Sequence, residues 1–326
     1  MASPPRVLTW HVHGSYLYYL SQTPCEFLLP VKDGRPEGYG GRSGHFDWPH
    51  NVTEVPAEHV RDVEVDVVLF QSPRNYLVDQ AELLSDAQRR LPRVYLEHDP
   101  PVERAADQRH LVDDPSVLLV HVTAFNELMW DAGDTPTVVI EHGVTVPDDA
   151  RFNGMVDRGI TVVNHLFSRG RRLGPDVFER VRASVPVDLA GMGSEERDGL
   201  GDLPHAGLLR READYRFFFN PIRYTSLGLA ILEAMMVGLP VVGLATTELP
   251  TVIESGRSGF LDTDVGRLIP HMQRLARAPD EAARLGEAAR ARALERFNID
   301  RFRADWQHLF EEVAGRRGTA APAWAR

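Results

Sequence analysis

The chain has 326 residues, enough for two domains or one large one. Its 36 Lys and Arg residues against 47 Asp and Glu residues give a formal net charge of −11. An acidic chain is a poor candidate for binding nucleic acid, whose phosphates need a basic surface. The 43% of hydrophobic and 25% of charged residues exclude a disordered or fibrous chain.

The single cysteine, Cys25, excludes an intramolecular disulfide and argues against a thiolate metal site. The first residues lack the charged and apolar regions of a secretion signal. No stretch approaches the roughly 20 apolar residues that span a bilayer. These features predict a cytoplasmic protein without an integral membrane segment.

Short apolar runs recur along the first half of the chain. They are nearly continuous in Val, Leu and Ile, which is typical of parallel strands buried on both faces. The predicted strands are Arg6–Trp10, Glu26–Val31, Asp66–Phe70, Arg93–Leu96, Val117–Val122 and Thr137–Ile140. The segment between Phe70 and Arg93 has helical spacing, whereas Lys32–Val55 is rich in Gly, Pro, His and Asp and predicts an irregular loop.

A second set of alternating strands and helices follows a seam near residue 150. Its predicted strands are Ile160–Val163, Val187–Leu189, Tyr215–Phe219 and Pro240–Leu244. Its predicted helices are Pro175–Ser184, Leu229–Val237, Leu268–Ala276 and a helical region from Pro279 to about Glu312. The two sets predict an α/β fold of two Rossmann-like domains. The tail 315–326 is expected to be disordered.

One loop of the second set has the features of a phosphate site. It runs from Arg223 to Gly228, between a predicted strand and a predicted helix. Free backbone N–H groups and the helix dipole both favour an anion at such a helix N-terminus. Glu233 lies about one turn into the helix, where an acidic side chain commonly binds ribose hydroxyls. The predicted donor-binding residues of this segment are Thr225, Ser226, Leu227, Gly228, Leu229 and Glu233.

This segment resembles the family 4 retaining glycosyltransferases of the GT-B fold. The family motif is matched at Pro221, Ser226, Gly228, Leu229, Glu233, Ala234, Met235, Gly238, Pro240, Val241 and Val242. The resemblance covers residues ~135–315 and implies that Glu233 holds the ribose of a nucleotide. The motif's first glutamate, which faces the donor sugar in the family, is replaced by Thr225, and a further family glutamate is replaced by Thr251.

The resemblance also implies a domain plan. Residues 1–150 would form the acceptor-side domain, and residues 151–300 the domain that binds the nucleotide-sugar. The helix 301–314 would cross back to brace the first domain. Its apolar residues Phe302, Trp306, Leu309 and Phe310 recur at helical spacing, as that role requires.

A basic loop follows the first strand of the second set and contains Arg169, Arg171 and Arg172. In the family, an Arg and a Lys of this loop bind the donor pyrophosphate, and arginines supply both charge and bidentate geometry. Arg169 is predicted as the first cation, with Arg171 or Arg172 as the second. The alternative is a solvated basic loop.

Two loops of the first half supply further candidates. His11 and His13 follow the first strand without a third residue at metal-ligand spacing, so no metal site is predicted. Gly14 either lets this loop approach the donor or acceptor or forms a strand-end turn. His98 follows another strand, and the resemblance implies that a histidine at this edge touches the donor sugar or the leaving group.

The expected function is that of a metal-independent retaining glycosyltransferase, with Arg169, Glu233 and His98 as catalytic candidates. The donor would be a nucleoside-diphosphate sugar, no other cofactor is expected, and the acceptor would be a small molecule, a glycan or a lipid-linked sugar. The alternative is a non-catalytic homologue that binds a nucleotide-sugar as a regulatory or partner subunit. Thr225 and Thr251 favour that alternative, and Glu233 with the arginine loop opposes it.

Overall fold

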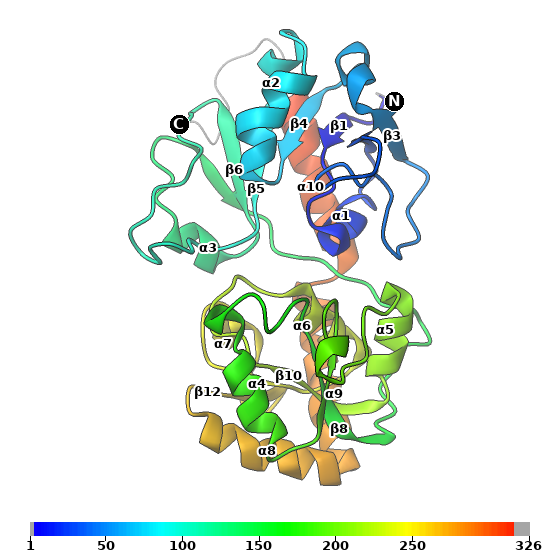
Figure 1. Cartoon of the computed structure of the whole chain (residues 1–326), viewed down its shortest axis with the longest axis vertical. Helices are drawn as coiled ribbons and strands as arrows, with labels where there is room; N and C mark the ends of the chain where they lie inside the picture. The colour runs from blue at the N-terminus through cyan, green and yellow to red at the C-terminus, as the bar shows by residue number, and fades with distance from the viewer. Residues whose placement is uncertain (1–2, 316–326) are drawn as a thin grey trace. The chain divides into compact units, whose positions relative to one another are not determined.

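The computed structural model describes residues 3–315 and divides into two compact units. Unit 1 is formed by residues 3–143 together with 299–315, and unit 2 is the continuous segment Val144–Asn298. Among the described residues, all named strands pair in parallel, in one sheet of seven and one of five strands (Figure 1). The predicted α/β class is confirmed.

The sheet of unit 1 has the strand order β3-β2-β1-β4-β5-β6-β7. The chain therefore builds outward from β1 in one direction and then from β4 in the other, which places a topological switch point between these two strands. The strands are β1 (Arg6–Thr9), β2 (Glu26–Val31), β3 (Val52–Pro56), β4 (Val67–Phe70), β5 (Arg93–Glu97), β6 (Val117–His121) and β7 (Thr137–Val139).

The helices of unit 1 are short, apart from the last. They are α1 (Gly14–Leu20), α2 (Gln80–Leu83), α3 (Ala124–Met129) and α10 (Ile299–Gly315), with 3-10 turns at Ala57–Asp62 and Gln88–Arg90 and a π-helix at Asn75–Asp79. All residues of β4 and β6 are buried, as expected for central strands rich in Val and Leu.

Two expectations for unit 1 are corrected. The loop predicted over Lys32–Val55 ends in an additional strand, β3, which lies at the edge of the sheet and exposes Thr53 and Pro56. The continuous helix predicted between Phe70 and Arg93 is broken into the π-helix, α2 and a 3-10 turn. The π-helix ends at Asp79, which is fully buried and accepts a hydrogen bond from Tyr39 Oη at 2.8 Å.

Helix α10 completes unit 1 from the far end of the chain. Its apolar stripe of Phe302, Trp306, Leu309 and Phe310 is buried. Trp306 Nε1 donates to Tyr16 Oη at 3.2 Å, which joins α10 to α1. Gly315 is the last residue of α10, and the remainder of the tail predicted over 315–326 lies outside the described residues.

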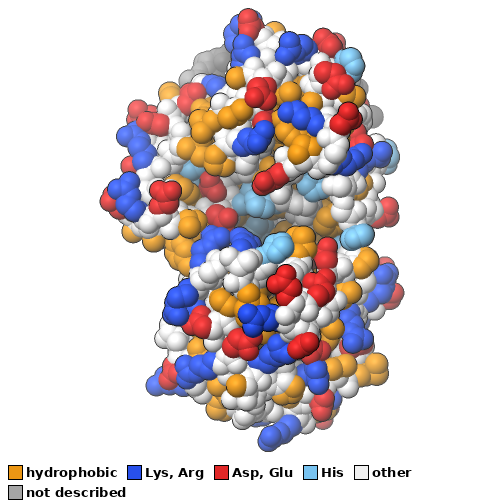
Figure 2. Space-filling view, viewed as in Figure 1, with side chains coloured by type: hydrophobic (Ala, Val, Ile, Leu, Met, Phe, Trp, Pro, Cys, Tyr) orange, Lys and Arg blue, Asp and Glu red, His pale blue; other side chains and the backbone are white. Residues whose placement is uncertain are grey.

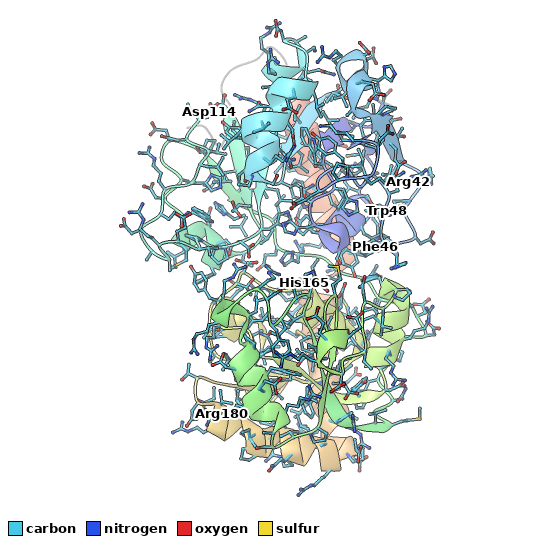
Figure 3. The ribbon with its side chains drawn as sticks, in the orientation of Figure 1. Arg42, Phe46, Trp48, Asp114, His165 and Arg180 are labelled. Carbon is cyan, nitrogen blue, oxygen red and sulfur yellow. The ribbon has the colours of Figure 1, made fainter. Side chains whose placement is uncertain are left out.

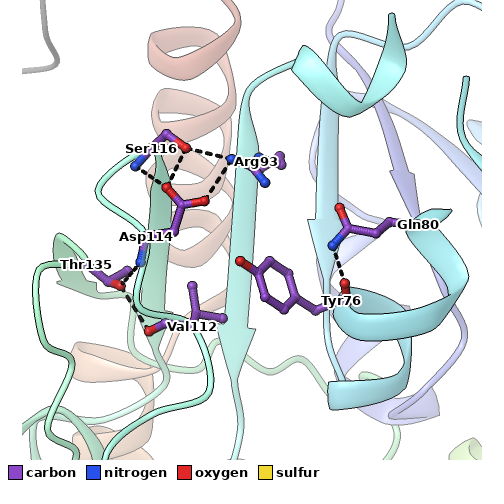
Figure 4. A network of polar contacts seen from close by, with 7 residues as sticks. All are labelled: Tyr76, Gln80, Arg93, Val112, Asp114, Ser116 and Thr135. Atoms are coloured by element: carbon purple, nitrogen blue, oxygen red, sulfur yellow. Dashed lines mark hydrogen bonds and ion pairs between the residues drawn. The ribbon is translucent and has the colours of Figure 1, made fainter. Parts of the chain in front are cut away.

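A polar network secures the N-terminal edge of β5 and β6 (Figure 4). Arg93 Nη2 donates to Asp114 Oδ2 at 2.9 Å and to Ser116 Oγ at 2.6 Å. The backbone N–H of Asp114 donates to Thr135 Oγ1 at 2.9 Å. Because ligands of open parallel sheets bind beyond the carboxyl ends of the strands, this network has a structural role at the opposite edge.

Unit 2 contains a five-stranded sheet of order β12-β11-β10-β8-β9, with its own switch point between β8 and β10. The strands are β8 (Val156–Val162), β9 (Val187–Ala190), β10 (Tyr215–Asn220), β11 (Val241–Leu244) and β12 (Gly259–Asp262). The helices are α4 (Pro175–Arg182), α5 (His205–Glu212), α6 (Leu229–Val237), α7 (Leu249–Val252), α8 (Val265–Arg277) and α9 (Pro279–Arg296), with 3-10 turns at Arg171–Leu173 and Glu195–Arg197.

Within residues 3–315, no helix combines the length and the apolar character needed to cross a membrane.

Candidate active site

The loops that follow β8 and β10 are in direct contact in unit 2. Gly174 ends the first loop at a positive φ of 77°, and a Cβ at this position would lie 2.0 Å from the Pro221 carbonyl oxygen. The backbone N–H of Arg223 donates to the Arg172 carbonyl at 2.9 Å. Only a glycine permits this approach, so the arginine loop and the predicted phosphate loop form one surface at the switch point.

The three arginines of the first loop differ in their surroundings. Arg169 is exposed, and it makes no ion pair with any residue in 3–315. Arg171 is also exposed but pairs with Asp176, with Nη1 and Oδ2 3.0 Å apart. Arg172 is partly buried, and its carbonyl accepts from the loop after β10. Arg169 is thus the member of the set whose charge faces solvent without a carboxylate partner.

Asp176 organises this surface from the first turn of α4. Arg223 donates to both of its carboxylate oxygens, at 2.6 and 2.7 Å, in the bidentate geometry that arginine favours. The hydrogen bonds from Arg223, together with the nearby charges of Arg223 and Arg171, lower the pKa of Asp176 to about 2. Asp176 is therefore ionised at neutral pH and ties the two loops together.

The segment Thr225–Leu229 leads into helix α6. Ser226 and Leu227 are buried, whereas Thr225 and Gly228 are partly exposed. Gly228 is extended, at φ −71° and ψ 134°, and as the N-cap residue it has no side chain to cap the helix. Since α6 begins at Leu229 beside the arginine loop, its first N–H groups and the arginines form an electropositive surface.

Glu233 lies in the second turn of α6 and is only 4% exposed. Its Oε1 accepts a hydrogen bond of 2.8 Å from Nε2 of His205, the first residue of α5. Sequence reasoning missed His205, because the two residues are 28 positions apart and no local pattern links them. The contact orients the carboxylate that was predicted to bind ribose.

A second carboxyl, that of Glu212 on α5, lies close to Glu233. Glu212 is fully buried, and neither of its oxygens has a hydrogen-bond partner within residues 3–315. It is two turns from His205, so the two side chains share one face of α5. Burial, and to a lesser extent the charge of Glu233, raise the pKa of Glu212 well above its usual range. Glu212 was not singled out from the sequence.

His98 lies in unit 1 at the carboxyl end of β5. Gln71 donates through Nε2 to Thr9 Oγ1 at 2.8 Å, which leaves its Oε1 to accept from His98 Nε2 at 3.2 Å. The His98 ring lies 4.1 Å from the His13 ring and 4.8 Å from the Tyr16 ring, centroid to centroid. Burial and the neighbouring His13 and His142 hold the pKa of His98 well below its usual range, so its imidazole is neutral at pH 7.

Gly14 is the first residue of α1, in the loop after β1. A Cβ at this position would lie 3.1 Å from both His11 Nε2 and the Phe46 ring. The space beside Gly14 is thus occupied by His11 and Phe46, and the role of Gly14 toward a donor or acceptor stays a prediction.

The predicted site residues fall into two groups. Arg169, Arg171, Arg172, the Thr225–Leu229 segment and Glu233 belong to unit 2, and Gly14 and His98 belong to unit 1. Lys and Arg side chains are intermixed with Asp and Glu over the visible face in Figure 2. Over the described part of the chain, no group of three or more His, Cys, Asp or Glu residues is placed to hold a metal ion.

Comparison with known proteins places this geometry in context. Residues 208–278 match the family model for "Glycosyl transferases group 1". This range contains α6 with Glu233 and the loop before it. Over 226 residues, the chain is 33% identical to alpha-maltose-1-phosphate synthase of Mycolicibacterium smegmatis (strain ATCC 700084 / mc(2)155), covering 61% of this chain. The match spans 56% of the length of that relative.

Solved structures resemble the chain over nearly its whole length. Sucrose-phosphate synthase from Thermosynechococcus elongatus superposes with a TM-score of 0.70 at 16% identity, covering 96% of this chain and all of that one. HepE of Anabaena in complex with UDP gives a TM-score of 0.67 at 15% identity, covering 94% and 99% of the two chains. At these identities the likeness concerns the fold. The protein thus has the GT-B fold, and its residues 208–278 are similar to the group 1 glycosyltransferases.

Proposed function

We propose that the protein is a retaining glycosyltransferase that transfers a sugar from a nucleoside-diphosphate sugar to an acceptor hydroxyl. The observation that carries this proposal is the joint surface of unit 2, where the arginine loop, the α6 N-terminus and the buried Glu233 lie at one switch point. The match of residues 208–278 to the group 1 glycosyltransferases supports the same activity. The complex of HepE with UDP supports a nucleotide donor by analogy of fold.

The parts of the donor are assigned to residues by their chemistry. The diphosphate would lie on the N–H groups at the start of α6, with Arg169 as the cation because it is exposed and forms no ion pair within residues 3–315. The ribose hydroxyls would donate to the Glu233 carboxylate, which His205 holds in place. The sugar would lie near Thr225, whose hydroxyl can exchange hydrogen bonds but carries no charge.

The proposed reaction needs no side-chain base. The bond from the anomeric carbon to the diphosphate oxygen breaks, and the acceptor oxygen forms its bond on the same face of the sugar. The acceptor proton passes to the departing diphosphate. Arg169 and the α6 N-terminus then stabilise the charge that develops on the leaving group, which is the task that a metal ion would otherwise perform. We therefore also propose that turnover is independent of added metal.

Glu233→Ala is expected to weaken nucleoside diphosphate binding by about 1.5–3 kcal/mol, because a charge-assisted hydrogen bond to the ribose is lost. Titration calorimetry with UDP, ADP and GDP measures the change. Glu233→Gln keeps an acceptor for His205 and serves where the alanine variant folds poorly. Glu254→Ala, an exposed carboxylate of the same unit paired with Arg257, is the control and should bind normally. Unchanged affinity in both Glu233 variants would refute the ribose assignment.

Thr225→Val is expected to raise the donor KM several-fold while leaving nucleoside diphosphate affinity nearly intact. The reason is that a hydroxyl hydrogen bond to the sugar contributes about 0.5–1.5 kcal/mol, whereas the nucleotide contacts lie elsewhere. Steady-state rates of donor hydrolysis, compared with calorimetry on the same variant, separate the two effects. A wild-type protein that binds the donor without turning it over, but gains hydrolysis in Thr225→Glu, would instead establish a non-catalytic homologue.

A further inference from the structure

The loop between β2 and β3 stands out in unit 1 because residues 32–51 contain no helix or strand. Connections of this length that contain no helix or strand usually have a function when they occur inside a compact domain. The loop starts at the carboxyl end of β2, and its backbone forms bridges from Gly38 to His11 and from Gly40 to Val31. It therefore lies at the edge of the sheet where ligands of parallel sheets bind.

The base of this loop is held rigidly. Arg35 donates to both carboxylate oxygens of Glu54 on β3, at 2.7 and 3.0 Å. Tyr39 Oη donates to the buried Asp79 at 2.8 Å. His11 Nδ1 donates to the Gly41 carbonyl at 2.6 Å. Contacts to three different elements fix the base, so the end of the loop, residues 42–50, is presented in a defined position. We call this segment the tip loop.

The tip loop carries an aromatic cluster that lies beside α1, with Phe46 and Trp48 labelled in Figure 3. The Phe46 ring stacks on Tyr18 of α1 at 5.2 Å between centroids. The Trp48 ring lies 5.6 Å from Phe46 and 5.6 Å from His11. Trp48 Nε1 donates to the Ser43 carbonyl at 3.2 Å, which fixes the indole orientation.

These rings are not part of the hydrophobic core. Trp10 and Tyr39, the core aromatics nearby in sequence, are at most 1% exposed, whereas Tyr18, Phe46 and Trp48 all retain exposed surface. Burial therefore does not account for placing two aromatic residues on an exposed loop. Preassembled aromatic surface of this kind is typical of recognition sites.

The tip loop also carries polar side chains. Arg42, His45 and Asp47 belong to the same segment and are exposed, and none of them forms an ion pair within residues 3–315. A pyranose ring has the matching chemistry, because its C–H faces are apolar and its hydroxyls point outward around the rim. An aliphatic chain would gain nothing from the three polar side chains, and a nucleotide already has its predicted site in unit 2.

We propose that the tip loop binds a pyranose ring of the acceptor, so that the acceptor is a glycan or a glycoside. The aromatic faces of Phe46 and Trp48 would pack against the C–H face of the sugar, and Arg42, His45 and Asp47 would exchange hydrogen bonds with its hydroxyls. As an acceptor site, this inference rests on the proposed function. The binding of a sugar at the tip loop is measurable without turnover.

The test is saturation-transfer NMR on the intact chain with methyl α-D-glucopyranoside, methyl α-D-mannopyranoside and maltotriose as probes. At least one probe is expected to bind, and Trp48→Leu should weaken it about 5- to 30-fold, the loss typical of removing an aromatic anchor. UDP, ADP and GDP affinities should stay within twofold of wild type. The matched control is Trp130→Leu, which should keep sugar binding. It removes a partly exposed tryptophan at the C-terminal end of α3, in the same unit.

Trp48→Phe separates binding from packing, because it keeps an aromatic face and the fold. Partial recovery of sugar binding in this variant supports the proposal. Equal sugar binding in wild type and a folded Phe46→Leu, Trp48→Leu double variant overturns it, as does the absence of binding for all three probes. Loss of nucleoside diphosphate affinity in Trp48→Leu would also overturn the proposal, because it would show that the aromatic rings contact the nucleobase of the nucleotide. A protein that binds sugar at the tip loop but no nucleoside diphosphate would overturn the proposed function and leave the sugar site standing.

Discussion

Arg169→Ala is expected to lower kcat by about 10²–10³, with little change in thermal stability. The guanidinium is exposed and contributes little packing, but in the proposed reaction it would stabilise charge on the departing diphosphate. Removing one preorganised electrostatic donor from an active site typically has an effect of this size. Steady-state kinetics with a saturating donor, together with a thermal unfolding curve of the same sample, measure both quantities.

Arg171→Ala is the internal comparison for this prediction. Arg171 already pairs with Asp176, so a smaller loss of turnover is expected, together with a slight loosening of the contact between the two loops. If Arg171→Ala or Arg172→Ala abolishes turnover while Arg169→Ala retains it, the cation has been assigned to the wrong arginine. If all three variants keep the wild-type rate, the loop does not bind the diphosphate.

Glu212→Gln is expected to stabilise unit 2 increasingly as the pH rises. Burial and the charge of Glu233 raise the pKa of Glu212 in the folded protein. Above its unfolded pKa of about 4.3, the unfolded chain releases this proton while the folded chain retains it, so the free energy of unfolding falls as the pH rises. The loss is about 1.4 kcal/mol for each pH unit until the folded pKa is reached. Glutamine does not titrate, so the free energy of unfolding of Glu212→Gln does not fall in this way as the pH rises.

Calorimetry between pH 4.5 and 8 measures the difference between Glu212→Gln and wild type. Because a chain with two units need not unfold in one step, the transition of unit 2 must be identified. Ile160→Val, a conservative change in its buried strand β8, marks that transition by lowering it alone. Stability curves of Glu212→Gln and wild type that run parallel across this pH range would show that Glu212 has its ordinary pKa.

The central strands could be predicted from the sequence because their environment leaves a simple pattern. β6 and β10 are runs of Val, Leu and Phe buried on both faces, and no local alternative suits such runs. β3 escaped prediction because an edge strand needs only half of its residues to be apolar, and Val52–Pro56 follows a segment rich in glycine. Whether a strand lies at the edge of a sheet depends on which other strands pair with it, and local periodicity does not show this pairing.

The broken helix before β5 shows how tertiary contacts override local spacing. Apolar periodicity over residues 75–91 favours a continuous helix, but Asp79 bonds to Tyr39 from a separate loop and to Asn75 Nδ2 at 2.8 Å. A buried carboxylate has to be satisfied, and a π-turn that ends at this residue accompanies these bonds. The need of Asp79 for hydrogen-bond partners arises only once the folded chain buries its carboxylate.

Part of the candidate site can be proposed from the sequence, where the chemistry follows from local geometry. A loop before a helix N-terminus marks a possible anion site, and this reasoning led to Thr225–Gly228 and Glu233. The partners of Glu233 could not be found in this way. His205 and Glu212 approach it from another helix, and only the packing of α5 against α6 shows which side chains face each other.

The discontinuity of unit 1 has a consequence for how the protein is made. The chain leaves unit 1 after Gly143 and returns only at Ile299, so the ribosome completes all of unit 2 before α10 exists. Unit 2 is one continuous segment whose ends already pair, through the backbone bridge between Val144 and Asn298. Domains usually fold during synthesis from the N-terminus onward. In this chain the first unit cannot be completed before the second has been synthesised, and a ribosome that stops before Trp306 releases a complete segment for unit 2 joined to a first unit that lacks the Trp306–Tyr16 contact.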